Sequence, residues 1–208
     1  MLKKKMMLTL IFFVFFSFGI ALQVKSNIGQ SAMNAFGLSL SSMLHIKIGT
    51  TINLLNTLFF LTYVCCLKFK ISLKEILQFG YIIINGVMIN FFVYLILPDV
   101  FFLNYTNKLF IFIIGIVISG VSLGILLFIG LIKFPLEAVC IEISNQFQMA
   151  FGKVRYLFDA IFVLGVLTIY ILDHSIFTIR EGTVISVLLL SYIISFTMKL
   201  LENVTEIQ

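Results

Sequence analysis

Asp159 and Arg155 are the two side chains whose types and spacing best suit chemistry inside an apolar run of this sequence. They are four residues apart, a spacing that places both on one face of a helix. Ionisable groups within a membrane-spanning helix are energetically expensive and therefore indicate function. Asp159 is thus a candidate proton or cation site. The structural alternative is a salt bridge with Arg155 that holds the helix near the membrane surface.

Polar residues at two further places are candidates for a substrate or ion site. Asn53 and Asn56 are three residues apart in an earlier apolar run, and Glu137 and Glu142 lie in a short segment that begins with Pro135. Amides in apolar helices often form hydrogen bonds between helices, which is the structural alternative for the asparagines. The alternative for the glutamates is exposure to cytoplasmic water.

The sequence lacks the common catalytic and cofactor-binding motifs. It has no H-E-x-x-H, G-x-S-x-G, P-loop or G-x-G-x-x-G pattern. The three cysteines, Cys65, Cys66 and Cys140, do not have the spacing of a disulfide framework or a metal site. We therefore expect no enzymatic activity, no catalytic residues, no metal and no cofactor.

The composition indicates that the solvent of this chain is a lipid bilayer. Of its 208 residues, 61% are apolar and 11% are charged, against roughly 45–50% and about 25% in soluble domains. The mean hydropathy is +1.17. So few polar residues cannot cover this apolar surface, which excludes a soluble globular protein. The net charge of +5 comes from short basic clusters between apolar runs, which indicate topology rather than nucleic-acid binding.

Six apolar runs are long enough to cross about 30 Å of hydrocarbon as helices. Two further stretches, 31–44 and 135–148, are apolar on one side only and, at about 21 Å as helices, are too short to cross. They are either re-entrant half-helices or amphipathic helices on the membrane surface, and the sequence leaves both readings open. The predicted spans are 6–24, 48–67, 76–97, 109–132, 156–172 and 183–198.

The distribution of basic residues supports six spans with both termini in the cytoplasm. This topology places ten basic residues inside and four outside, whereas crossings by both short stretches would give eight against six. The inside set is Lys3, Lys4, Lys5, Lys68, Lys70, Lys74, Lys133, Lys153, Arg155 and Lys199, and the outside set is Lys25, Lys47, Lys108 and Arg180.

The two halves of the chain are similar to each other. At an offset of 103, Gly49 pairs with Gly152 and Asn56 with Asp159. Each half holds three spans and one short stretch, and because three is an odd number, the copies are predicted to have opposite orientations. The expected fold is an all-α membrane protein of six transmembrane helices, arranged as two inverted three-helix repeats. The predicted copies are residues 1–104 and 105–208.

Short motifs along nearly the whole chain resemble a known family. They are Phe18-Gly-Ile-Ala-Leu22, Ile28-Gly29, Ile48-Gly-Thr50, Pro135-Leu-Glu137, Arg155 with Asp159, and Arg180-Glu-Gly-Thr183. In these motifs the chain resembles the YczE/YitT-type bacterial integral membrane proteins. The resemblance implies a multi-pass plasma-membrane protein whose biochemical function is not established.

The leading functional hypothesis is a permease or exporter for a small molecule or ion, with its site at the interface of the two repeats. The site candidates are Asp159, Arg155, Asn53, Asn56, Glu137 and Glu142. One alternative is a non-transporting assembly or regulatory subunit that binds another membrane protein or a second copy of this chain. The other is a substrate-binding subunit of a vitamin-uptake system.

Overall fold

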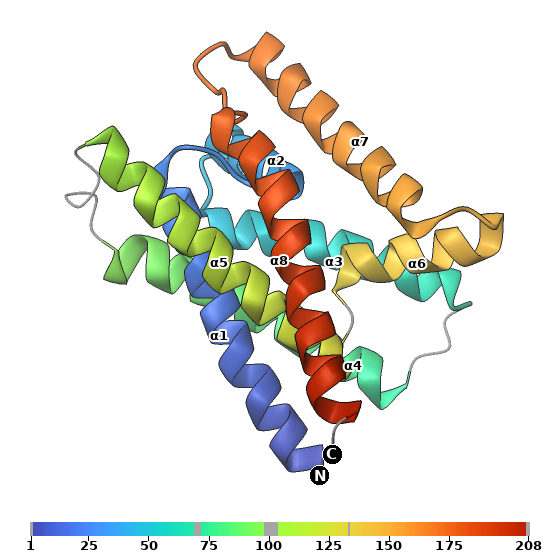
Figure 1. Ribbon diagram of the computed structural model, residues 1–208. Coiled ribbons are helices and arrows are strands. Elements are labelled where there is room, and N and C mark those ends of the chain that lie inside the picture. The colour runs from blue at the N-terminus through green and yellow to red at the C-terminus, as the bar shows by residue number, and fades with distance from the viewer. Residues whose placement is uncertain (1, 69–71, 98–103, 133, 207–208) are drawn as a thin grey trace.

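The computed structural model describes residues 2–68, 72–97, 104–132 and 134–206. Within these residues the secondary structure is helical, and they contain no strands. Figure 1 shows the long helices together with two short ones, of which α6 (Pro135–Phe147) reaches the edge of the molecule beside the start of α7 (Phe151–Leu172). Lys70 and Lys133, two of the basic residues used to predict the topology, lie outside the described residues.

Six helices of the described chain are long and apolar enough to span a membrane, which confirms the six predicted spans and a multi-pass membrane protein. The third continues into a short π-helix, η1 (Phe92–Ile96). The first turn of α1 and the last turn of α8 lie at the same end of the molecule (Figure 1). The six helices are α1 (Leu2–Ser26), α3 (Ile48–Cys66), α4 (Leu73–Phe91), α5 (Tyr105–Ile129), α7 (Phe151–Leu172) and α8 (Glu181–Glu206).

Several boundaries of the predicted spans were wrong, most of all the end of the sixth, which was predicted at residue 198 whereas α8 extends to Glu206. The fourth was predicted to reach residue 132, but α5 ends at Ile129 because Gly130 adopts a left-handed conformation with φ 64°. The fifth was predicted to begin at residue 156, but α7 begins at Phe151. Charged residues such as Lys153 interrupt the apolar run without interrupting the helix, because lysine and arginine are good helix formers.

The two short stretches form helices, as predicted: α2 (Ala32–Leu44) and α6 (Pro135–Phe147). The side chain of Ser31 accepts a hydrogen bond from the backbone N–H of Asn34 and so caps α2. Proline is well suited to the first position of α6, because its missing N–H would have no helical partner there.

Helices α1 and α5 pack against each other along the centre of the bundle (Figure 1). Their backbones approach closely, so that a Cβ added at Gly19 would lie 2.8 Å from the carbonyl oxygen of Gly115. Small residues allow this close contact, which provides van der Waals packing between membrane helices. Helix α4 packs on α1, and α8 packs on α5.

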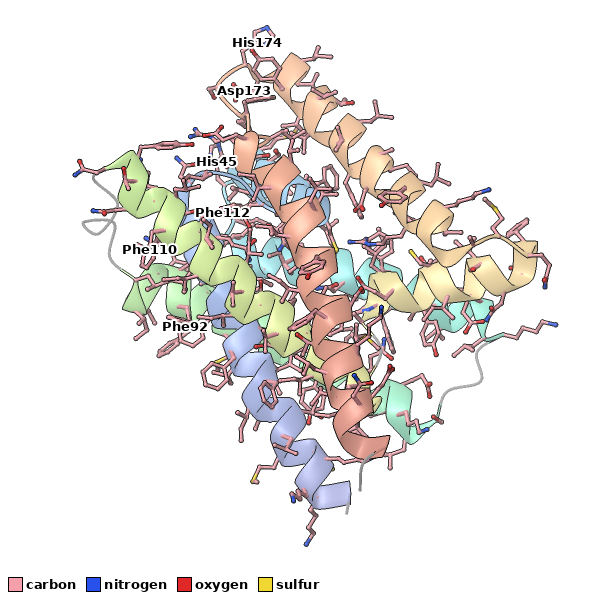
Figure 2. All side chains as sticks on the ribbon, viewed as in Figure 1. His45, Phe92, Phe110, Phe112, Asp173 and His174 are labelled. Carbon is pink, nitrogen blue, oxygen red and sulfur yellow. The ribbon has the colours of Figure 1, made fainter. Side chains whose placement is uncertain are left out.

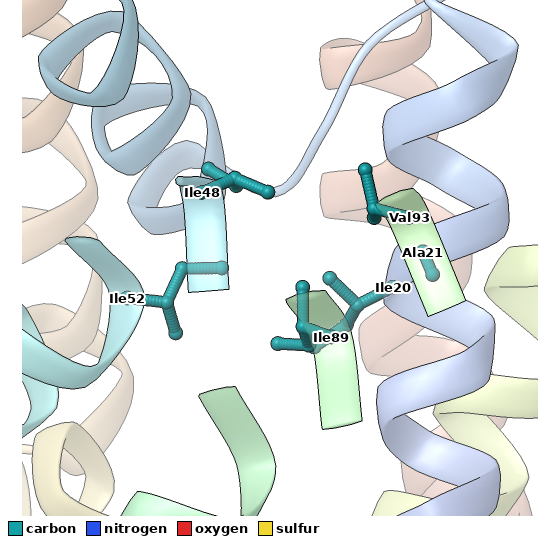
Figure 3. Close-up of a cluster of buried hydrophobic side chains, with 6 residues drawn as sticks. All are labelled: Ile20, Ala21, Ile48, Ile52, Ile89 and Val93. Carbon is teal, nitrogen blue, oxygen red and sulfur yellow. The ribbon is translucent and has the colours of Figure 1, made fainter. Parts of the chain in front are cut away.

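A buried apolar cluster joins α1, α3, α4 and η1. Figure 3 shows its six side chains, which come from α1, from α3 and from α4 with its continuation η1. Their close packing fixes the position of α3 and α4 relative to the central pair. The cluster consists of Ile20, Ala21, Ile48, Ile52, Ile89 and Val93.

The chain enters α2 from the interior of the bundle. After α1 it runs beside the first turns of α8, where Gly182 N–H donates to the Ile28 carbonyl at 3.1 Å and Ser186 Oγ donates to the Gln30 carbonyl at 3.1 Å. Helix α2 then returns toward the end of the molecule at which α7 finishes, so that His45, Asp173 and His174 lie at one end (Figure 2).

The chain also enters α6 from the interior of the bundle. Phe134, immediately before α6, stacks on Phe13 of α1 with ring centroids 5.4 Å apart. Helix α6 then runs along α3, where Ile143 packs in the cluster that contains Tyr63 and Val64, near the end of α3. Both short helices therefore begin inside the bundle and lead outward, which favours the re-entrant reading over helices that lie on the membrane surface.

Candidate functional site

A central cavity of about 80 Å³ lies where the short helices begin. Every one of the six long helices contributes at least one side chain to its lining, and so do the first turns of α2 and α6. Half-helix N-termini that meet inside a bundle are typical of transporter binding sites. The polar side chains in the lining are Gln23, Ser31, Asn34, Asn56, Asn85, Ser119, Glu137 and Arg155.

Hydrogen bonds between buried side chains hold part of this lining in place. Gln23 Nε2 donates to Ser119 Oγ at 2.9 Å, which joins α1 to α5. Ser17 Oγ donates to Asn85 Oδ1 at 2.9 Å, which joins α1 to α4. These bonds fix the side chains before any solute arrives, so that binding loses less conformational freedom.

Arg155 and Asp159 lie on one face of α7, as their spacing predicted. Arg155 Nη2 is 3.5 Å from Asp159 Oδ1, and both side chains are mostly buried. They line a second, lateral cavity of about 180 Å³ between α7 and α8, together with Ser186 and the first residues of α2. Arg155 also lines the central cavity, so that the two cavities adjoin.

The structure separates the two candidate glutamates. Glu137 lies in the first turn of α6 and lines the central cavity. Glu142 lies further along the same helix and belongs to the lining of neither the central nor the lateral cavity. A negative side chain in the first turn of a helix interacts favourably with the positive end of the helix dipole, which is the position of Glu137 in α6.

The two candidate asparagines of α3 also have different surroundings. Asn56 is 8% exposed and lines the central cavity. Asn53 instead joins α3 to α4: its Nδ2 donates to the Ile83 carbonyl at 3.1 Å, and its Oδ1 accepts from Gly86 N–H at 3.0 Å. The structure therefore brings together Asn56, Glu137 and Arg155.

Sequence reasoning missed Gln78 and Gln23, both amides within apolar runs. Gln78 lines a small cavity of about 10 Å³ with Asn56, Asn85 and the start of α6. Its side chain is 3% exposed, and its Nε2 is buried without a hydrogen-bond partner among the described residues. A systematic search for amides in the apolar runs identifies both glutamines, but only the tertiary structure shows that they face cavities.

Charged and polar groups also gather at the end of the molecule where α2 and α7 finish. Ser175 donates two hydrogen bonds to Asp173 Oδ1, from Oγ at 2.7 Å and from its backbone N–H at 2.9 Å. These bonds hold the pKa of Asp173 below its ordinary value, because they stabilise the charged carboxylate. His45 and His174 contribute smaller favourable charge interactions.

The described residues contain no group of three or more His, Cys, Asp or Glu side chains that could hold a metal ion. The polar groups around the central cavity are amides, hydroxyls and two ionisable side chains, Glu137 and Arg155. Such a set can bind a small polar solute by hydrogen bonds and charge.

Comparison with known proteins gives one match. A family model covers residues 3–199, which include the eight α-helices of the described residues except the first residue of α1 and the last residues of α8. No curated protein and no solved structure matches the chain. The family carries no assigned activity, so that the function must be argued from the site itself. The chain belongs to the family described as "Family of unknown function (DUF6198)".

Proposed function

We propose that this protein is a permease of the plasma membrane that carries a small polar molecule or ion through its central cavity. The observation that carries the proposal is the start of both short helices at one cavity lined by all six long helices. A solute at this position touches both halves of the chain, so that it is released when one half moves relative to the other. This is how carriers with internal repeats work.

The packing of the helices supports an inverted repeat. Helix α2 packs on α7, and its counterpart α6 packs on α3. Likewise α1 packs on α4, and α5 packs on α8. A two-fold axis between α1 and α5 would exchange the members of each pair. This pattern agrees with the sequence similarity of residues 1–104 and 105–208, and with their predicted opposite orientations.

We propose further that both termini lie in the cytoplasm, as the basic residues predict. The first turn of α1 and the last turn of α8 share one end of the molecule (Figure 1), as six crossings require. A reporter that is active only in the cytoplasm, fused separately to each terminus, should be active in both fusions. Activity of one fusion alone would exclude an even number of crossings. The resemblance to the YczE/YitT type remains a prediction.

The proposal is tested by solute uptake into proteoliposomes. The probes are radiolabelled amino acids, carboxylates, amines and Rb⁺, each compared with protein-free vesicles. We expect at least one probe to enter only vesicles that contain the protein. Glu137→Gln should reduce this uptake at least tenfold, because Glu137 lines the central cavity. Glu142→Gln, a change of the same type on the same helix outside the cavity lining, should not.

Two results would overturn the permease. The first is the absence of protein-dependent uptake of every probe by folded protein, checked by its cooperative thermal unfolding. The second is an equal loss of uptake in both glutamate variants, because it would place transport away from the central cavity. We propose transport rather than catalysis because the cavity lining brings together amides, hydroxyls and the ionisable side chains of Glu137 and Arg155. The sequence contains no recognised catalytic motif beside them.

A further inference from the structure

The charges around the central and lateral cavities nearly balance. The ionisable side chains in the two linings are Glu137, Asp159 and Arg155, whose formal charges sum to one negative charge. The N-termini of α2 and α6 contribute about half a positive charge each. A site without net charge in a low-dielectric interior favours a solute without net charge, because an ion would leave one charge uncompensated.

The two short helices differ in their first turns. Helix α6 carries Glu137 there, whereas α2 has no acidic residue in its first turn. Arg155 shares both cavity linings with Ser31, the residue that caps α2. Asp159, 3.5 Å from Arg155, offsets the charge of Arg155. The half positive charge of the α2 N-terminus therefore remains at this end, and the charge of Glu137 gives negative potential at the start of α6. The site has one end for an anionic group and one for a cationic group.

Several buried polar atoms at this site lack a hydrogen-bond partner within the described part of the chain. They are Arg155 Nη1, Gln78 Nε2 and Asp159 Oδ1, the last of which is ion-paired with Arg155 Nη2 at 3.5 Å without a hydrogen bond. The glutamine is 3% exposed and faces the small cavity beside the start of α6. A buried polar group without a partner is energetically unfavourable. The cavities therefore favour an occupant that offers both donors and acceptors.

From this arrangement we propose that the transported solute is a small zwitterion with one ammonium and one carboxylate group. The carboxylate lies between the N-terminus of α2 and Arg155, and the ammonium lies toward Glu137. The central cavity of about 80 Å³ is smaller than the 300–1,000 Å³ typical of drug-sized ligands, which limits the solute to the size of a small amino acid. This inference rests on the permease proposed above.

Matched compounds test the need for both charges. Alanine is compared with ethylamine, which lacks the carboxylate, and with propionate, which lacks the ammonium. Proline is compared in the same way with pyrrolidine and cyclopentanecarboxylate. Uptake is measured in proteoliposomes, and binding is measured as the thermal shift of the purified protein. We expect at least one zwitterion to exceed both of its singly charged analogues at least tenfold in uptake.

The outcomes separate this inference from the permease. Protein-dependent uptake of an amine or carboxylate as fast as its zwitterion would overturn the inference and leave the permease standing. Protein-dependent uptake of Rb⁺ with no uptake of alanine or proline would have the same consequence. If no probe shows protein-dependent uptake, both the zwitterion inference and the permease are overturned.

Substitution of Glu137 gives a second test. Because it compares the uptake of two solutes by the same protein, it tolerates partial loss of folded protein. Glu137→Gln removes a negative charge from the ammonium end. The ratio of alanine to propionate uptake should therefore fall at least tenfold, whereas Glu142→Gln should leave it unchanged. An unchanged ratio in Glu137→Gln would contradict the assignment of the ammonium end.

Discussion

The two halves of the molecule differ most where their second and third long helices meet. In the first half, Gly49 of α3 and Gly86 of α4 bring the two backbones into contact, and a Cβ added at either glycine would clash with the carbonyl oxygen of the other. In the second half, α7 and α8 do not pack against each other along their described lengths. The lateral cavity lies between them.

The difference has a cause in the amino-acid sequence. Gly152 occupies the position on α7 that Gly49 has on α3, but a Cβ added at Gly152 would meet no atom within 4 Å. Tyr156 stands where the first half has Asn53, and its side chain is 68% exposed. Small residues permit close contact of helices, and amides then hold them together. The second half keeps the small residue but lacks the amide.

In a carrier built from two copies, such a difference has a functional meaning. The second and third long helices are in contact in the first half, as α3 and α4, which we call the closed arrangement. In the second half they are apart, as α7 and α8, which we call the open arrangement. Exchange of these two arrangements between the halves would open the central cavity first to one side and then to the other. The following predictions test this comparison.

The largest effect is expected from an added methyl group at the closed contact. Gly49→Ala places a Cβ against the Gly86 carbonyl and 2.7 Å from Asn90 Oδ1. Overpacking of this kind lowers the free energy of unfolding by about 1–3 kcal/mol. Gly152→Ala at the equivalent position should not lower it. Chemical unfolding in mild detergent measures both, and equal losses would show that the halves do not differ here.

Loss of the amide at the closed contact should have a smaller effect. Asn53→Ala removes the hydrogen bonds to the Ile83 carbonyl and to Gly86 N–H. Polar contacts between membrane helices contribute about 0.6 kcal/mol on average, so that this variant should lose on the order of 1 kcal/mol. Tyr156→Ala, its counterpart in the second half, should change the free energy of unfolding by less than about 0.5 kcal/mol. A larger loss in Tyr156→Ala would contradict the open arrangement of α7 and α8.

Distances between spin labels would show whether α7 moves relative to α8. Labels on cysteines that replace Leu157 and Leu188 span α7 and α8, and labels at Leu54 and Ile83 span α3 and α4; all four side chains are exposed. We expect a broad distance distribution for the first pair and a narrow one for the second, because only the second pair of helices is packed. Two narrow distributions would rule out mobility of α7 relative to α8. The exposed native Cys65 and Cys66 are replaced by serine in both proteins.

The smallest effect is expected in the turn that joins α7 to α8. The hydrogen bonds from Ser175 hold the pKa of Asp173 below its ordinary value, which is about 3.9. A lowered pKa in the folded state stabilises the fold fully above the ordinary pKa, and this contribution is lost as the pH falls through the lowered value. Ser175→Ala should raise the pKa of Asp173, as measured by carboxyl carbon NMR. An unchanged pKa would show that these bonds do not form.

Much of the fold could be predicted because it depends on local properties of the chain. Apolar length predicted six spans, and the one-sided pattern of two shorter stretches predicted α2 and α6. Boundaries were less predictable, because the left-handed cap at Gly130 and the charged first turns of α7 depend on backbone geometry rather than hydropathy. For the site, ionisable residues in apolar runs identified Asp159 and Arg155, and their spacing predicted their shared face.

The sequence by itself determined that this protein is an all-helical membrane protein, because burial of apolar side chains in lipid depends on composition and run length. Only the tertiary structure decided which polar residues meet. It placed Glu137 at the central cavity and Glu142 outside its lining, and it used Asn53 to join α3 to α4. The physical reason is that these choices depend on contacts between helices far apart in the sequence. The approach of α2 and α6 to one cavity likewise follows from the packing of both halves together.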